Sequence, residues 1–270
     1  MTYQELYSNI QDKHSYLCVG LDTDINKIPI HLRSFDDPVF EFNKQIIDAT
    51  QDLCIAYKLN LAFYETLGHQ GLISLERTIA YIPDDIFLIA DAKRGDIGNT
   101  SRMYATAFFD HYKFDSITVS PYMGKDSVTP FLSFKDKWVI LLALTSNIGS
   151  NDFQLLQYNG NCLYEEVLKK SKQWAGPDQL MYVVGATQAE SLKSIREIIP
   201  DNFLLIPGVG AQGGDLEAVT RNGINKSVGM MVNASRSIIY ASQDIDFAKA
   251  ARIQASQIQS EMKRLLEKYG

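Results

Sequence analysis

The sequence predicts an α/β protein that folds as a single (β/α)₈ TIM barrel over residues 1–270. Short, mostly apolar runs recur eight times along the chain, as is typical of strands buried on both faces of a parallel sheet. A segment with helical spacing follows each run, and 270 residues suit a barrel domain of about 250 residues. A doubly wound open sheet has the same local order of elements, so that architecture remains the alternative.

The eight expected strands are the runs in which apolar and β-branched residues predominate. In chain order they are SYLCVGLD (15–22), LCIAYKLN (53–60), IFLIADAK (86–93), DSITVSPY (115–122), WVILLAL (138–144), LMYVVGA (180–186), FLLIPGVG (203–210) and SVGMMVNAS (227–235). Helices are expected at 37–51, 62–81, 99–112, 124–134, 161–175, 187–198 and 213–222. The stretch from Asp244 to the end repeats apolar residues at roughly helical spacing, so it is expected to form the last helix.

One segment does not fit the alternation of strands and helices. Residues 147–160, NIGSNDFQLLQYNG, follow the fifth expected strand and are interpreted as a loop insertion rather than a domain boundary. The chain has no linker, low-complexity segment or clear internal repeat, so one domain is expected.

Composition narrows the class of function. A net charge of −6 argues against a general nucleic-acid binder, but a pocket can still attract a small anion. The longest apolar run, 138–144, is far too short to span a membrane, and the first residues lack the apolar core of a signal peptide. The widely spaced Cys18, Cys54 and Cys162 are expected to be reduced, buried thiols of a cytoplasmic protein. The four histidines show no metal-ligand spacing.

Polar residues gather where the expected strands end. In parallel α/β folds the functional site lies at the carboxyl ends of the strands, whichever of the two architectures holds. The polar residues at these ends are Asp22, Lys58, Asn60, Asp91, Lys93, Thr145, Ser146, Asn147 and Arg236, with Asp96 in the loop beyond the third strand. For Asp22 and Ser146 alone, turn and cap chemistry explains the residues equally well.

The third strand carries the most unusual pattern, because buried apolar residues run directly into DAKRGDIGNTS (91–101). Asp91 and Lys93 are two residues apart, so both side chains are expected to point to the same side of the sheet. A structural ion pair, with Asp96 or Asn99 capping the next helix, is one explanation. Lys58 on the neighbouring strand favours another, in which charges crowded into one desolvated mouth shift each other's pKa values for catalysis.

A phosphate site is expected beside these charges. The segment PGVGAQGGD (207–215) has four glycines that allow close backbone approach, and its N–H groups can surround an anion at the start of the next helix. Arg236 follows the next strand and can bind phosphate oxygens with two hydrogen bonds. Loops after the seventh and eighth strands frequently form phosphate sites in this barrel.

Together, DAKRGDIGNTS, PGVGAQGGD and SRSIIY (235–240) resemble the orotidine 5′-phosphate decarboxylase family. YKLNLAFYE (57–65) and SPYMGKDS (120–127) are most similar to its longer bacterial branch, and the resemblance extends from GLDTD (20–24) to SRSIIY. It implies conversion of orotidine 5′-phosphate to UMP and CO₂ in pyrimidine biosynthesis, without a cofactor. It also implies that Lys93 donates a proton to C6 of the pyrimidine after CO₂ leaves.

The resemblance assigns further roles. Asp91 and Asp96 would alternate with Lys58 and Lys93 in a charged network, and Asp22 and Lys58 would bind the ribose hydroxyls. The remaining implied contacts are Ser146 at the pyrimidine amide, Gly210, Gln212 and Arg236 at the phosphate, and Asp96, Ile97 and Thr100 contributed by the partner subunit of a homodimer. Many relatives have glycine where this chain has Ser235, and the insertion at 147–160 weakens the match after the fifth strand.

Two other classes of protein remain as alternatives. Sugar-phosphate decarboxylases or aldolases of the same superfamily use Mg²⁺ and typically carry a carboxylate where this chain has Lys58. A barrel that binds a nucleotide phosphate without catalysis would not need Asp91, Lys93 and Asp96. Loss of the absorbance of orotidine 5′-phosphate distinguishes these alternatives.

Overall fold

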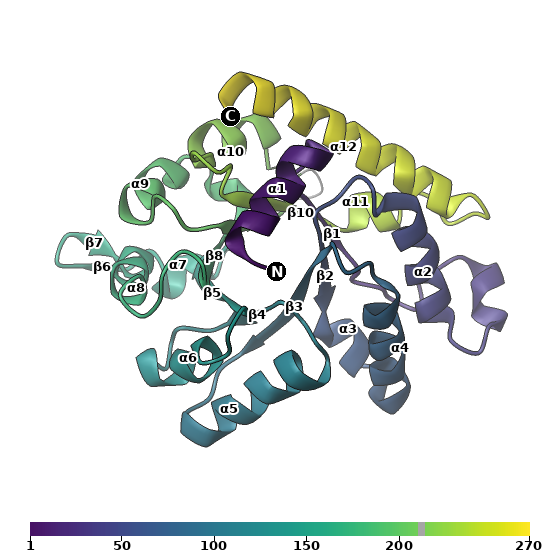
Figure 1. Ribbon diagram of the computed structural model, residues 1–270, viewed down its shortest axis with the longest axis horizontal. Helices are drawn as coiled ribbons and strands as arrows, with labels where there is room; N and C mark the ends of the chain where they lie inside the picture. Colours follow the sequence, from purple (N-terminus) through teal and green to yellow (C-terminus); the bar gives the residue numbers. More distant parts are fainter. Residues whose placement is uncertain (210–213) are drawn as a thin grey trace.

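The computed structural model describes residues 1–209 and 214–270 of the chain. Within them, eight parallel strands close into a barrel (Figure 1) in the order β1-β10-β9-β8-β5-β4-β3-β2. The strands are β1 (Leu17–Gly20), β2 (Ala56–Asn60), β3 (Phe87–Arg94), β4 (Ser116–Val119), β5 (Trp138–Leu144), β8 (Leu180–Val184), β9 (Leu204–Pro207) and β10 (Met230–Ala234). Because β1 pairs with both β2 and β10, the (β/α)₈ prediction is confirmed and the open sheet is excluded.

Helices surround the barrel at the expected positions. They are α2 (Pro38–Thr50), α4 (Gly68–Tyr81), α5 (Gly98–Thr106), α6 (Lys125–Leu132), α8 (Leu163–Ser171), α9 (Ser191–Ile198), α10 (Leu216–Gly223) and α12 (Phe247–Tyr269). The first and last of these pack together, since Phe42 and Phe247 stack with ring centroids 5.1 Å apart. None of the helices in the described part of the chain has the length and apolar character needed to cross a membrane.

One expected helix, 62–81, is divided in two. A short helix α3 (Leu61–Glu65) ends at its C-cap Thr66, and α4 begins at Gly68, whose φ of +58° lies in the left-handed region and breaks the helical path between them. Gly71 in α4 then lies against α3, because a Cβ atom there would meet the Tyr64 carbonyl oxygen at 1.9 Å. The continuous helix predicted from apolar spacing is therefore wrong at this point.

Several short elements were not predicted. The first is α1 (Tyr3–Lys13), which begins with a capping box between Thr2 and Glu5. The others are η1 (Ile30–Ser34), α7 (Ser150–Phe153), β6 (Gln157–Tyr158), β7 (Asn161–Cys162), η3 (Ala186–Gln188) and α11 (Arg236–Ile239), whereas η2 (Ala107–His111) continues α5 within the helix expected at 99–112. The segment expected as an insertion thus contains α7 and the first strand of a small hairpin outside the barrel.

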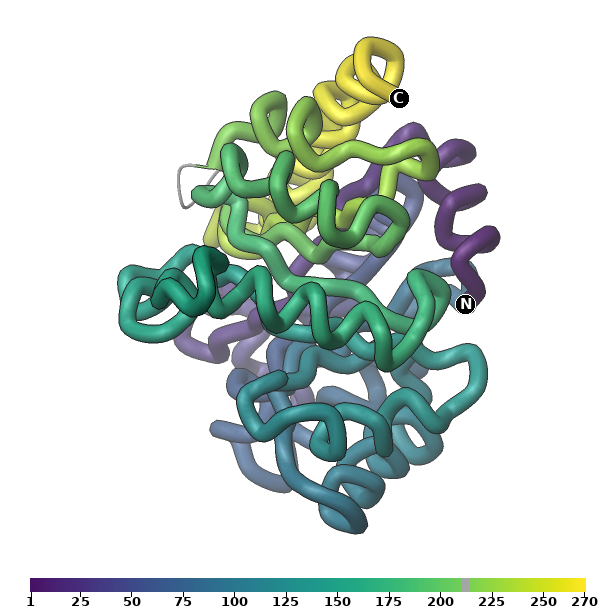
Figure 2. The backbone as a smooth tube through the Cα atoms, turned by 90° about the vertical axis from the view of Figure 1, so that its left-hand side faces the viewer, coloured from purple at the N-terminus to yellow at the C-terminus, as the bar shows by residue number. Residues whose placement is uncertain are grey.

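The two ends of the barrel are covered differently. Helix α1 lies across the end where the strands begin, where Trp138 donates a hydrogen bond to the Met1 carbonyl (2.8 Å) and Tyr3 packs edge-on against Phe203. Figure 2 shows α1 on one side of the molecule and the segment after β5 on the opposite side. The end where the strands finish is left open as a cavity.

The three cysteines are free thiols. Cys18 and Cys54 are fully buried, as expected, and burial raises the pKa of the Cys54 thiol to about 12. The expectation of a buried thiol is wrong for Cys162, which is only partly buried because it lies on the hairpin outside the barrel.

Candidate active site

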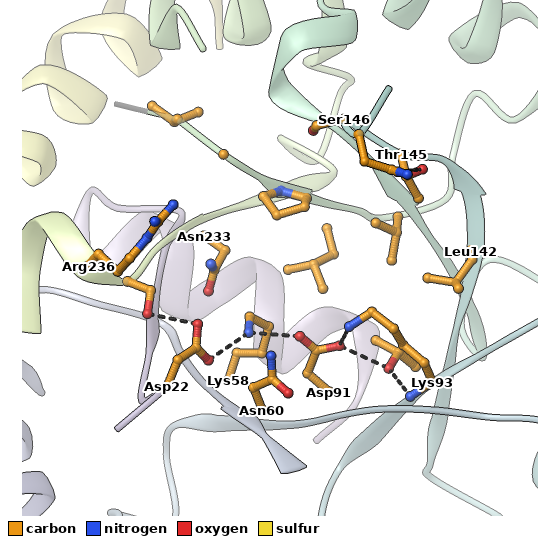
Figure 3. Close-up of a pocket in the computed structure, with 18 residues that line it drawn as sticks. Asp22, Lys58, Asn60, Asp91, Lys93, Leu142, Thr145, Ser146, Asn233 and Arg236 are labelled. Atoms are coloured by element: carbon orange, nitrogen blue, oxygen red, sulfur yellow. Dashed lines mark hydrogen bonds and ion pairs between the residues drawn. The ribbon is translucent and has the colours of Figure 1, made fainter. Parts of the chain in front are cut away.

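A cavity of 350 Å³ opens at the carboxyl ends of the barrel strands. Most of the polar residues predicted at the strand ends line it, and Figure 3 shows them pointing toward one another. These residues are Asp22, Lys58, Asn60, Asp91, Lys93, Thr145, Ser146, Asn147 and Arg236, joined by Thr118 and Asn233. Residues up to 214 positions apart in the sequence therefore meet in one site.

Four of these side chains form a chain of ion pairs, referred to below as the charged chain: Asp22, Lys58, Asp91 and Lys93. The Lys58 ammonium lies 3.2 Å from Asp22 Oδ1 and 2.9 Å from Asp91 Oδ2. Lys93 Nζ lies 2.5 Å from the other oxygen of Asp91. Negative and positive groups thus alternate from β1 to β3 along one wall of the cavity (Figure 3).

Burial and ion pairing shift the pKa values of Lys58 and Asp91 in opposite directions. Burial alone would lower the pKa of Lys58, but the adjacent Asp22 and Asp91 carboxylates raise it above its usual value. Burial likewise tends to raise the pKa of Asp91, yet Lys58 and Lys93 hold it down at about 2. The Lys58 ammonium and the Asp91 carboxylate are therefore both charged at neutral pH.

A backbone irregularity places Lys93. The pairing of β3 with β4 shifts between Ala90 and Arg94, and Lys93 has a φ of +49°, in the left-handed region. The simple alternation predicted from the sequence therefore does not hold through 91–93. Asp91 and Lys93 nevertheless meet, because the bulge turns the Lys93 side chain back toward Asp91, and its side chain stays 52% exposed to the cavity.

The Asp22 end of the charged chain is held in place by residues that follow the last barrel strand, β10. Ser235 Oγ lies 2.9 Å from Asp22 Oδ2, and the Tyr240 hydroxyl donates to the Asp22 carbonyl at 3.0 Å. Sequence reasoning noted Ser235 only as a departure from related chains and missed Tyr240. Arg236 begins α11 at this end of the cavity, across from Lys93 (Figure 3).

The opposite wall is apolar. Leu142, Val183 and Leu205 face the cavity from β5, β8 and β9. Ser146 lies at the edge of this wall, and its buried Oγ makes no hydrogen bond with any described residue. A buried hydroxyl without a partner is costly, so it marks a position suited to a polar group of a ligand.

Some predicted site residues do not line this cavity. Asp96, Ile97 and Thr100 lie outside it, and Asp96 Oδ1 accepts a hydrogen bond from the Ile97 backbone N–H at 2.7 Å. The capping role considered for Asp96 or Asn99 is wrong, because Ile97 occupies the N-cap of α5 and no described side chain caps it. Gly210 and Gln212 lie outside the described residues.

Thr118 and Asn233 were missed by the sequence reasoning, although each is a polar residue within an otherwise apolar strand. That signal is weak on its own, because buried polar residues in strands are usually satisfied by neighbouring backbone. No group of three or more His, Cys, Asp or Glu side chains within 1–209 and 214–270 is arranged to hold a metal ion.

Comparison with known proteins covers nearly the whole chain. The family model described as "Orotidine 5'-phosphate decarboxylase / HUMPS family" matches residues 15–251. The chain is 59% identical over 271 residues to an orotidine 5′-phosphate decarboxylase of Bacteroides fragilis, covering 99% of each chain. It is 57% identical over 270 residues to the protein of that name in Flavobacterium johnsoniae, again covering 99% of each.

Solved structures give the same result. The structure of Leishmania donovani OMP decarboxylase matches with a TM-score of 0.83 and 34% identity, covering 98% of this chain and 99% of that one. The Leishmania donovani UMP synthase also matches with a TM-score of 0.83, at 37% identity, but this chain covers only 57% of it. The similarity therefore extends over fold, sequence and length in the first case and over one part of a longer chain in the second.

Proposed function

The chain belongs to the orotidine 5′-phosphate decarboxylase / HUMPS family, and we propose that it converts orotidine 5′-phosphate to UMP and CO₂ in pyrimidine biosynthesis. The observation that carries this proposal is the charged chain at the barrel mouth, with Lys93 at its outer end. A binding protein without catalysis would have no use for a cation fixed beside a carboxylate in this cavity.

The reaction requires a fixed cation rather than a carrier of electrons. When the C6–carboxylate bond breaks, the electron pair stays on C6, where no neighbouring carbonyl is placed to delocalise it. The Lys93 ammonium stabilises this developing negative charge and then transfers one N–H proton to C6, leaving a neutral amine. Asp91 orients the Lys93 ammonium for that transfer, because its Oδ1 lies 2.5 Å from Nζ.

Binding of the rest of the nucleotide is assigned to the other cavity residues. Arg236 binds the phosphate, with Gly210 and Gln212, and its position across the cavity from Lys93 supports this role. Asp22 and Lys58 bind the ribose hydroxyls, and the unpartnered Ser146 Oγ binds the pyrimidine amide. Binding energy at the phosphate then contributes to transition-state stabilisation at C6.

The functional unit is proposed to be a homodimer with shared sites. Asp96, Ile97 and Thr100 lie outside the cavity of their own chain, as expected if they complete the cavity of a partner. The surface around α5 and α6 also exposes large apolar side chains, namely Ile97, Met103, Tyr104, Tyr122 and Met123. Apolar surface of this kind is typical of a protein interface.

The proposed place of action is the cytoplasm, where the free, buried thiols of Cys18 and Cys54 stay reduced. No cofactor is proposed to take part. Lys58 occupies the centre of the charged chain, where a metal-dependent relative would carry a carboxylate ligand.

The test is to mix purified protein with orotidine 5′-phosphate and follow the loss of substrate absorbance together with CO₂ release. Equal amounts of UMP and CO₂ are expected, and the rate should survive exhaustive treatment with EDTA. No turnover would refute the proposal. Loss of activity on chelation that Mg²⁺ restores would instead place the protein among the metal-dependent sugar-phosphate enzymes.

A further inference from the structure

Three residues of β3 lie opposite a single residue of β4. Ala90 pairs with Ile117 and Arg94 pairs with Val119, so residues 91–93 bulge out opposite Thr118 alone. Such a bulge breaks the backbone ladder and re-aims the side chains that it carries. Here it carries Asp91 and Lys93, the two groups nearest the proposed chemistry.

The Thr118 side chain replaces the missing ladder. Its hydroxyl oxygen accepts a hydrogen bond from the Lys93 backbone N–H at 2.9 Å. The same oxygen lies 3.2 Å from Asp91 Oδ1 and 3.5 Å from the Ala90 carbonyl oxygen. A hydroxyl has one hydrogen to donate, and the nearer, charged carboxylate is the stronger acceptor. Thr118 thus contacts the backbone of the proton donor and the side chain that orients its ammonium.

We propose that Thr118 is a positioning residue for the reaction, which fixes Lys93 and Asp91 relative to each other through one hydroxyl group. The inference rests on the proposed decarboxylase function. Thr118 is 1% exposed, so its hydroxyl cannot exchange these partners for bulk water. Lys93 is a non-glycine residue in the strained left-handed region, and the hydrogen bond from its backbone N–H to Thr118 helps to maintain that conformation.

Ser116 provides a matched comparison on the same strand. It lies two residues earlier, so it faces the same side of the sheet, and it is also fully buried. Its hydroxyl donates to the Leu88 carbonyl at 3.2 Å and contacts none of the charged chain. A hydroxyl that merely satisfies the barrel interior would behave like Ser116, whereas a positioning hydroxyl affects turnover.

The experiment compares Thr118→Val, Thr118→Ser and Ser116→Ala with the wild type on orotidine 5′-phosphate. Thr118→Val keeps the shape but removes the hydroxyl, and misplacing a reacting group by about 1 Å can cost about 100-fold in rate. We expect its kcat to fall by about 10- to 100-fold while KM and the Kd of UMP change by less than about 3-fold. Thr118→Ser should recover kcat to within about 3-fold of wild type, and Ser116→Ala should leave it unchanged.

Two results would overturn the inference while leaving the proposed function intact. One is a kcat for Thr118→Val within about 3-fold of an active wild type. The other is a Thr118→Ser variant as slow as Thr118→Val, because the hydroxyl would then not be the group that matters. If Thr118→Val does not fold, as judged by its circular dichroism, Thr118→Ala takes its place with the same expectations. An inactive wild type would remove the proposed function and with it the reaction that Thr118 is inferred to serve.

Discussion

Lys58 at the mouth of the barrel is buried and Arg196 at its base is partly buried, but the partners of these two cations differ. Arg196 donates to the carbonyl oxygens of Gly223, Asn202 and Gly229, each at 2.6 Å. Lys58 instead lies between the two carboxylates of Asp22 and Asp91, whose side chains also line a cavity. The two environments also shift the pKa in opposite directions, because burial lowers that of Arg196 to about 10 while the carboxylates raise that of Lys58.

This difference is the one expected between a structural cation and a functional one. Backbone carbonyls cannot change charge or move far, so the Arg196 contacts fasten the segments that enter β9 and β10. The carboxylates at Lys58 connect to a further cation, Lys93, which faces the cavity. Substitutions at the mouth should therefore affect turnover, and substitutions at the base should affect stability. A substitution with the opposite effect would contradict this separation of roles.

The largest expected effect is that of Lys93→Ala. Loss of the proposed proton donor and its positive charge should lower kcat/KM on orotidine 5′-phosphate by about 1000-fold or more. The melting temperature should change little, because the Lys93 side chain is 52% exposed. Lys226→Ala is the control, because Lys226 lies on the surface near the base of the barrel, where it pairs with Asp201 at 3.1 Å. An effect on stability rather than on turnover would contradict the separation of roles.

The next effect concerns Arg236→Ala, at the proposed phosphate end of the mouth. Losing a charge-assisted pair should cost several kcal/mol in kcat/KM on the nucleotide, or about 100-fold and more. On the phosphate-free nucleoside orotidine, the same substitution should cost almost nothing. Equal losses on the two substrates, measured by steady-state kinetics, would remove Arg236 from the phosphate site.

A smaller effect is expected at the base. Arg196→Met removes the donors of several buried carbonyls, so the free energy of unfolding should fall by about 2–3 kcal/mol in urea titrations. The folded fraction should keep the kcat/KM of the wild type, because Arg196 does not line the cavity. A large drop in kcat/KM with unchanged stability would show that base and mouth are not separate.

The smallest effect is the contribution of Asp91 to acid stability. Its pKa in the folded protein is about 2, below the value of about 4 in an unfolded chain. The ionised carboxylate therefore stabilises the fold above pH 4, and this contribution of about 2 kcal/mol is lost as the pH falls from about 4 to about 2. Wild type should lose more stability than Asp91→Asn over that range in urea titrations. Equal losses would show that Asp91 does not have this depressed pKa.

Much of the mouth could be predicted from the sequence because strand ends are local features. Asp22, Lys58, Asp91 and Arg236 each end or follow an apolar run, and a parallel barrel gathers those ends at one face. The contact of Ser235 with Asp22 could not be predicted in this way, because it joins residues 213 positions apart. The bulge opposite Thr118 also depends on the pairing of two strands rather than on either sequence alone.

Helix α1 was also not predicted, although its first residues carry a recognised sequence pattern of helix beginnings. Thr2 and Glu5 form a capping box, which is a sequence pattern of helix beginnings. The break before Gly68 could also have been anticipated from a glycine inside a helical pattern. Both signals were overlooked because the prediction relied on apolar spacing, which indicates the boundaries of helices poorly.

The central claim is that the charged chain at the mouth performs the chemistry and is completed by Asp96 of a second copy. Lys93→Ala and Asp96→Ala homodimers should each be nearly inactive, because every site lacks one group. Refolding the two variants together in equal amounts should give about half mixed dimers, each with one intact site in two.

The decisive measurement is the activity of that refolded mixture, with mixed dimers confirmed by mass spectrometry. The shared site predicts recovery to about a quarter of the wild-type rate. If both groups came from one chain, every site would still carry a substitution, and a mixture as inactive as its parents would contradict the account.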